Sequence, residues 1–148
     1  MRRLGAWAEC GTRLEGTTLA PFGLCHGEFN PTSLHIGADG WRLLDWAGPT
    51  LGPGLFDLAG WQWTTDPPDI EAFDALVDAY IHAGGPETAR SQRGGLPAGQ
   101  WAFGWHRLVV IAWYLEQQTT WIADPSLDDT YQDVIRRHLS EATECLEP

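Results

Sequence analysis

Apolar residues recur three and four positions apart in four segments of the chain, and this spacing predicts amphipathic helices. Two prolines at 67 and 68 would end a further, shorter helix that begins after the glycines near residue 54. His138 lies on the apolar stripe of the last segment, where we expect a core or helix-edge histidine rather than a ligand. The predicted helices are residues 3–15, 55–65, 70–81, 100–118 and 130–146.

Short apolar runs in the first third of the chain predict β-strands instead. One run occupies residues 22–25, directly after a proline. Two more, Leu34 to Ile36 and Trp41 to Leu44, are separated by the turn sequence ADG. Apolar runs joined by such a turn are typical of a β-hairpin.

Two stretches rich in glycine and proline interrupt these patterns. We expect residues 48–54 to form no regular structure, and residues 84–99 to form a flexible connector between helices. The whole pattern predicts a mostly helical α+β fold. No repeat or change of composition divides the chain, so we expect a single domain over residues 1–148.

The charge balance narrows the range of partners. The formal net charge is -11, and all nine basic residues are arginines. Such a surface repels nucleic acids and anionic membranes, and it suits a cationic substrate or a divalent metal, unless it is simply a solvated acidic surface. The sequence shows neither a leader peptide nor an apolar membrane span, so we expect a cytoplasmic protein.

Cysteine and tryptophan invite functional interpretations that their spacing does not favour. Cys10, Cys25 and Cys145 are too few and too scattered for a disulfide framework, so we expect small buried side chains. The nine tryptophans could form a sugar-binding platform. Because several fall at helical spacing, we expect most of them to pack in the core or between helices.

Acidic residues bracket the predicted hairpin. Glu28 precedes its first strand, and Asp45 follows its second. A hairpin brings its two ends together, so one acid could accept a proton while the other holds Mg²⁺. The alternative is a turn with a helix-capping glutamate and a hydrogen-bonded histidine. Zinc is disfavoured, because His26 and His35 lack a convincing third ligand.

A nucleophilic site is also disfavoured here. Cys25 and His26 are adjacent on a strand, so their side chains point to opposite faces and cannot easily activate each other. Ser33 lacks the GxSxG context of a nucleophile elbow.

Three sequence blocks in this region occur together in a known order. The blocks HGEFNPTSLHI, WRLLDW and GPGLFDLA resemble the catalytic segment of the aminoglycoside phosphotransferase and choline kinase family, which has a protein-kinase-like fold. The resemblance implies a C-terminal lobe, with a catalytic segment at residues 22–60 and a helical region at 61–148. It also implies ATP, Mg²⁺ and a small-molecule acceptor such as an aminoglycoside or another amine or alcohol.

The resemblance assigns roles in the loop residue by residue. His26 and Gly27 would shape the catalytic loop. Glu28 stands where the family has its catalytic aspartate, so it would be the base. Asp57 matches the aspartate of the DLA motif and would support the loop from behind.

The metal-binding positions follow in the same way. Asp45 matches the family's metal-binding aspartate, and Ser33 stands in place of its metal-binding asparagine. Asn30 is a nearby substitute ligand. The base and one metal ligand therefore depart from the family pattern.

A larger departure from the family concerns its nucleotide-binding lobe. We expect this lobe to be absent, because few residues precede His26 and the chain contains no lysine. The first hypothesis is a phosphotransferase C-terminal lobe. The second is a catalytically silent, truncated or pseudokinase-like module that binds a small molecule, a separate lobe or itself. The third is a tryptophan-lined carbohydrate-binding protein. For the acceptor, Tyr80, His106 and Glu116 are the candidates after the DLA motif.

Overall fold

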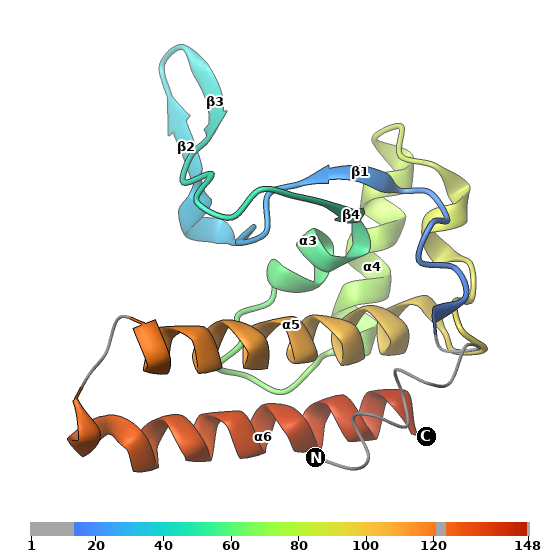
Figure 1. Cartoon of the computed structure of the whole chain (residues 1–148). Helices are drawn as coiled ribbons and strands as arrows, with labels where there is room; N and C mark the ends of the chain where they lie inside the picture. The colour runs from blue at the N-terminus through green and yellow to red at the C-terminus, as the bar shows by residue number, and fades with distance from the viewer. Residues whose placement is uncertain (1–13, 121–123, 148) are drawn as a thin grey trace.

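Two long antiparallel helices form one side of the molecule in the computed structural model, which describes residues 14–120 and 124–147. They are α5 (Ala98–Thr120) and α6 (Asp128–Leu146) (Figure 1). Their contact is close at Gly104, where an added methyl group would collide with the side chain of Leu146. Glycine at this position therefore lets the two helices approach each other.

Two shorter helices pack over α5 and complete the core. They are α3 (Leu55–Gly60) and α4 (Ile70–His82). Asp69 caps the start of α4, because its carboxylate accepts from the Ala72 amide. Phe56 of α3 stacks on Trp101 of α5, with ring centroids 5.4 Å apart. The buried cluster draws on all four helices and the α4–α5 connector: Leu55, Ala59, Phe73, Val77, Ala89, Leu96, Ala98, Trp101, Ala102, Phe103, Ala142, Cys145 and Leu146.

The strands form two separate antiparallel pairs above the helices (Figure 1). A short ribbon pairs β1 (Phe22–Cys25) with β4 (Thr50–Pro53). A hairpin of β2 (Leu34–Gly37) and β3 (Gly40–Leu43) projects away from the helices. Three short 3-10 turns complete the fold: η1 (Pro31–Ser33), η2 (Glu87–Arg90) and η3 (Pro125–Leu127).

Much of the predicted architecture is confirmed. The class is α+β and mostly helical, the hairpin and the first strand are present, and the three long helices after residue 69 occur close to their predicted bounds. His138 is fully buried, as expected of a core histidine, and Cys25 and Cys145 are buried free thiols. Cys10 and nearly all of the helix predicted over residues 3–15 lie outside the described residues.

The helix predicted over residues 55–65 ends early, at Gly60. The following segment is held by side chains rather than by helical hydrogen bonds. The Gln62 amide pairs with the backbone of Asp69 in both directions, at 2.8 and 3.1 Å. Arg137 donates to the carbonyl oxygens of Thr64 and Thr65. These tertiary contacts compete with the helix and explain why the two prolines do not mark its end.

Both stretches expected to be irregular contain ordered structure. Residues 50–53 form β4, because a two-stranded ribbon has two edges and tolerates Pro53 at its end. Residues 84–99 contain η2 and a backbone bridge between Arg93 and Leu96. The buried Arg93 guanidinium donates to the carbonyls of Gly16, Leu19 and Ala20. The connector is therefore anchored, not flexible.

The predicted burial of aromatic and apolar residues is wrong in part. Trp101 is in the core, but Val109, Ala112 and Leu115, apolar residues of the helix predicted over residues 100–118, are exposed. In the second half of α5, Val109, Val110 and Trp113 line the cleft described below. The tryptophans that are also exposed are Trp41, Trp46, Trp63 and Trp113.

Within the described part of the chain, no helix combines the length and the apolar character that crossing a membrane would require.

Candidate functional site

The turn that follows β1 is held from below by one carboxylate. Asp57, in the first turn of α3, accepts from the backbone amides of His26 at 2.7 Å and of Gly27 at 3.0 Å. Each carboxylate oxygen takes one of these charge-assisted bonds. The position of the loop is thereby tied to α3 and, through α3, to the helical core.

The His26 ring joins this turn to the end of the hairpin. Its Nε2 lies 2.7 Å from the carbonyl oxygen of Leu44, and since a carbonyl only accepts, Nε2 carries the proton. The ring also packs against Trp46, with centroids 4.7 Å apart. His26 is buried, and its Nδ1 has no hydrogen-bond partner among the described residues. The histidine thus connects two segments that are distant in sequence.

Gly27 is required by both backbone conformation and space. Its φ of 87° lies in the left-handed region, which other residues rarely adopt. A methyl group there would also collide with the carbonyl oxygen of Gly48. The loop therefore passes directly against the segment that leads into β4.

The backbone of Glu28 is fixed while its side chain stays exposed. Its carbonyl oxygen accepts from Asn30 Nδ2 and from Ser33 Oγ, each at 2.9 Å. Asn30 in turn caps η1, because its Oδ1 accepts from the Thr32 amide and hydroxyl. The expected helix-capping role of glutamate is therefore filled by Asn30, and Glu28 extends from a rigid loop toward solvent.

Asp45 follows the hairpin in an unusual conformation. Its φ of 64° is the one positive value at a non-glycine residue in the described part of the chain. Aspartate tolerates this region better than most residues, and such conformations cluster at functional sites. The Leu44 amide donates to the Ser33 carbonyl at 2.8 Å, which brings Asp45 next to Ser33. The hairpin thus brings these two predicted residues together.

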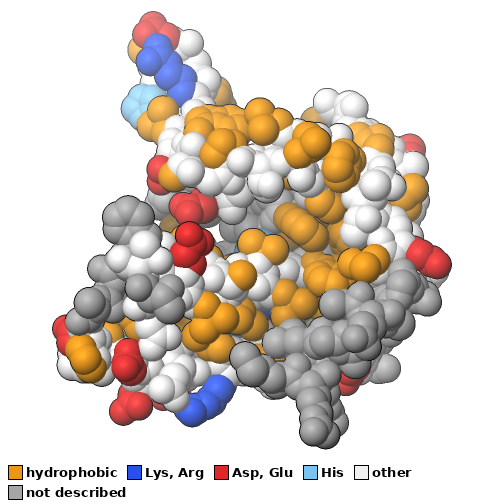
Figure 2. Space-filling model, viewed as in Figure 1, with side chains coloured by type: hydrophobic (Ala, Val, Ile, Leu, Met, Phe, Trp, Pro, Cys, Tyr) orange, Lys and Arg blue, Asp and Glu red, His pale blue; other side chains and the backbone are white. Residues whose placement is uncertain are grey.

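A cleft of about 690 Å³ opens beside Glu28, between the loop and α5. Its walls come from β4, from the segment after α3 and from the second half of α5. Figure 2 shows hydrophobic side chains over the β1–β4 ribbon and over α5, on either side of a hollow. Gly27, Glu28, Asn30, Asp57 and His106 are the predicted residues in the lining, whereas Asp45 and Ser33 do not contribute to it.

Comparison with known proteins now adds an independent observation. The model of the phosphotransferase enzyme family matches residues 2–92, which is more than half of the chain. The chain belongs to this phosphotransferase family. Searches among curated proteins and among solved structures gave no match. The match contains the whole of the loop and hairpin described above, so the family assignment and the geometry concern the same residues.

Family members of this kind use Mg²⁺, and the oxygen donors present fit that ion only in part. Asp45 is exposed and offers a hard carboxylate ligand, as Mg²⁺ prefers. Ser33 is buried, and its hydroxyl already donates to Glu28. Asn30 Oδ1 accepts two hydrogen bonds. The described residues contain no cluster of three acidic, histidine or cysteine side chains suited to a metal. A magnesium ion here would therefore rely on Asp45, water and phosphate oxygens.

Two groups in the lining of the cleft, Cys25 and His106, are held in their neutral forms. Burial, assisted by the Asp57 carboxylate, raises the pKa of Cys25 to about 11. Burial, assisted by the charges of Arg107 and His138, lowers the pKa of His106 to about 4. At pH 7 the thiol is protonated and the imidazole is uncharged. Cys25 is thus not a reactive thiolate, in agreement with its expected structural role.

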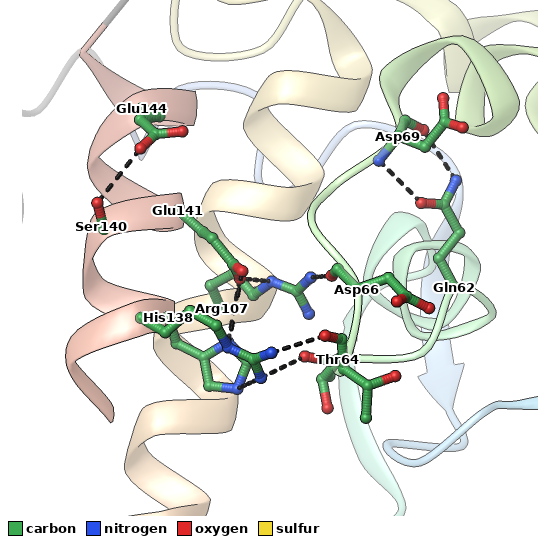
Figure 3. Close-up of polar contacts among 11 residues, drawn as sticks. Gln62, Thr64, Asp66, Asp69, Arg107, His138, Ser140, Glu141 and Glu144 are labelled. Carbon is green, nitrogen blue, oxygen red and sulfur yellow. Dashed lines mark hydrogen bonds and ion pairs between the residues drawn. The ribbon is translucent and has the colours of Figure 1, made fainter. Parts of the chain in front are cut away.

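A buried charge network lies behind the cleft, and the sequence pattern gave no indication of it. Arg107 of α5 forms an ion pair of 2.7 Å with Glu141 of α6 (Figure 3). Glu141 also contacts His138 Nδ1 at 3.1 Å. Arg107 donates to the carbonyl of Asp66 at 2.7 Å.

Proposed function

We propose that the chain carries the catalytic segment of a phosphotransferase that transfers the γ-phosphoryl group of ATP to a hydroxyl group of a small molecule. Glu28 would act as the base, and Asp45 would hold Mg²⁺. The observation that carries the proposal is the fixed loop. Asp57 holds the amides before Glu28, Asn30 and Ser33 hold its carbonyl, and Glu28, with its exposed side chain, is part of the cleft lining.

In this mechanism the protein mainly positions the reactants. The Glu28 carboxylate would accept the proton of an acceptor hydroxyl bound in the cleft. Asp57 and His26 would keep the loop in place without touching the reactants. Bound Mg²⁺ would neutralise charge on the phosphates. Ser33 would act through Glu28, by fixing its carbonyl oxygen, rather than as a metal ligand in its present conformation.

Two family positions are altered, and both bear on rate. Glu28 is one methylene longer than the family's aspartate, which can displace the proton acceptor by about an ångström and cost about a hundredfold in rate. Ser33 has a shorter reach than the asparagine it replaces. The assignment of the chain as a C-terminal lobe belongs to this proposal.

Titration of the protein with ATP and Mg²⁺ at millimolar concentration tests the proposal by calorimetry. We expect measurable heat, and we expect Asp45→Asn to weaken binding about tenfold, because a carboxylate ligand of the metal is lost. Asp39→Asn is the matched control, since Asp39 is an exposed acid in the turn between β2 and β3.

A restored motif provides the second part of this test. If neither the natural chain nor the double variant Glu28→Asp with Ser33→Asn gives heat with ATP and Mg²⁺, the proposal that this chain catalyses phosphoryl transfer by itself is abandoned.

A second candidate function is partner binding without catalysis, and the exposed apolar ribbon favours it. Leu24 and Leu51 are cross-strand partners, and they are 69% and 71% exposed. Phe22, on the same strand, is 44% exposed. Apolar patches of this kind mark interaction surfaces. The partner would be a second copy of the chain or a nucleotide-binding lobe.

Sedimentation velocity over a range of concentrations tests for self-association. We expect Leu24→Glu with Leu51→Glu to raise the dissociation constant of a dimer at least about tenfold, because charges would replace the apolar contact. Leu127→Glu, at an exposed leucine where η3 meets α6, is the control. A monomer at all concentrations would contradict self-association and leave the nucleotide-binding lobe as the partner.

A further inference from the structure

The lining of the cleft beside Glu28 is mainly apolar and aromatic. Trp63, from the segment after α3, contributes one wall. Val109, Val110 and Trp113, from the second half of α5, contribute another. Trp63 and Trp113 are 47% and 45% exposed, so each ring has surface available for contact. Rings of this kind bind flat apolar bodies.

The described residues give the cleft one available negative charge. Among them the lining contains two acids, Glu28 and Asp57, and no arginine. Both Asp57 oxygens already accept backbone hydrogen bonds. The net charge of -11 is therefore spread over the rest of the surface. A polycation placed here would leave most of its ammonium groups against apolar walls, which is unfavourable.

His106 supplies a neutral polar group in the same lining. The residue is 8% exposed, and its Nδ1 is buried with no hydrogen-bond partner among the described residues. Buried polar atoms are seldom left unpaired without a reason such as a ligand site. An uncharged imidazole can exchange a hydrogen bond with a neutral ligand group without adding charge to the cleft.

The wall that carries Trp63 is held rigidly from behind. Arg137 of α6 donates to the carbonyls of Thr64 and Thr65, and Arg107 of α5 donates to that of Asp66 (Figure 3). Three successive carbonyls are thus fixed by two arginines. A wall fixed before binding lowers the entropic cost of binding a rigid ligand.

We propose that this cleft takes an uncharged hydroxylated molecule with a flat apolar body, rather than a polycationic aminoglycoside. Its ring packs between Trp63 and Trp113, and its hydroxyl lies at Glu28. The inference rests on the proposed function in one respect only, which is the role of Glu28 as the base next to the hydroxyl. The apolar walls and the neutral His106 select the ligand whether or not a phosphoryl group is transferred.

Titration of the ¹⁵N-labelled chain with tryptophol, an indole that carries a hydroxyethyl group, tests the proposal without ATP. The indole N–H signals of Trp63 and Trp113, assigned from single alanine variants, are followed by NMR. We expect both signals to shift, and we expect Trp113→Ala to weaken binding about fivefold. Trp41→Ala is the matched control, because Trp41 lies on the projecting hairpin, outside the cleft.

Two further ligands complete the experiment. Indole, which lacks the hydroxyl, is expected to bind about threefold more weakly. Neomycin is expected to leave the Trp63 and Trp113 signals unshifted at the concentrations where tryptophol shifts them. The proposal is overturned if neomycin shifts these signals at lower concentration than tryptophol does, if tryptophol shifts neither, or if Trp41→Ala weakens binding as much as Trp113→Ala. A failed ATP titration would instead count against phosphoryl transfer alone.

Discussion

Replacing Glu141 by alanine is expected to lower the free energy of unfolding by about 3–5 kcal/mol. The substitution leaves the Arg107 guanidinium buried without its carboxylate, and the Arg107 side chain is 1% exposed in the ion pair. His138 loses a hydrogen-bond partner at the same time. Urea unfolding, followed by circular dichroism, measures the change.

Matched variants separate this effect from the loss of any glutamate on α6. Glu144→Ala removes an exposed glutamate that contacts only Ser140 among the contacts in Figure 3, so we expect a change within about 0.5 kcal/mol. Arg107→Met with Glu141→Met replaces both charges by apolar groups and is expected to recover much of the loss. A cost below about 1 kcal/mol for Glu141→Ala would show that the pair is not the structural tie between α5 and α6 that its burial indicates.

Replacing Gly27 by alanine is the second substitution with a large expected effect, about 2–3 kcal/mol of stability. The left-handed φ costs about 1–2 kcal/mol for a residue with a side chain, and the collision with the Gly48 carbonyl adds to it. The loop must then shift relative to Gly48, and a shift of the loop weakens the hydrogen bonds from the His26 and Gly27 amides to Asp57. Urea unfolding measures the loss, and exchange of these two amides with solvent locates it.

The opposite side of this contact provides the control. An added methyl group at Gly48 meets no atom within 4 Å, so Gly48→Ala is expected to be nearly neutral. If Gly27→Ala and Gly48→Ala lowered the free energy of unfolding equally, glycine would be needed at both positions for backbone flexibility. The close approach of Gly27 to the Gly48 carbonyl would then have no special role.

The parts of the fold that could be predicted from sequence are those set by local pattern. The hairpin was predictable because a turn sequence joins two apolar runs, and α4 because its apolar spacing ends at two glycines. The helix after Leu55 was predicted too long, because distant arginines on α5 and α6 hold the carbonyls of residues 64–66. Contacts between distant residues of this kind leave no periodic signal.

The candidate site could also be predicted from the sequence only in part. The family resemblance led to the correct family and to a loop whose residues the structure brings together around Glu28 and Ser33. The functional roles of these residues stay predictions. The sequence does not reveal the aromatic walls of the cleft, because it predicts core or inter-helix packing for most of the tryptophans, and spacing alone does not distinguish a core ring from rings such as Trp63 and Trp113 that line a cleft.

Arg93 links two distant parts of the chain by a hydrogen bond. Its guanidinium donates to the Gly16 carbonyl, 77 positions earlier in the sequence. The chain between these two residues contains the loop at Glu28, the hairpin, α3 and α4. The family match ends at residue 92, one position before Arg93. The end of the family match is therefore not the end of the folding unit. A fragment that ended at residue 92 would lack Arg93 and its hydrogen bond to the Gly16 carbonyl.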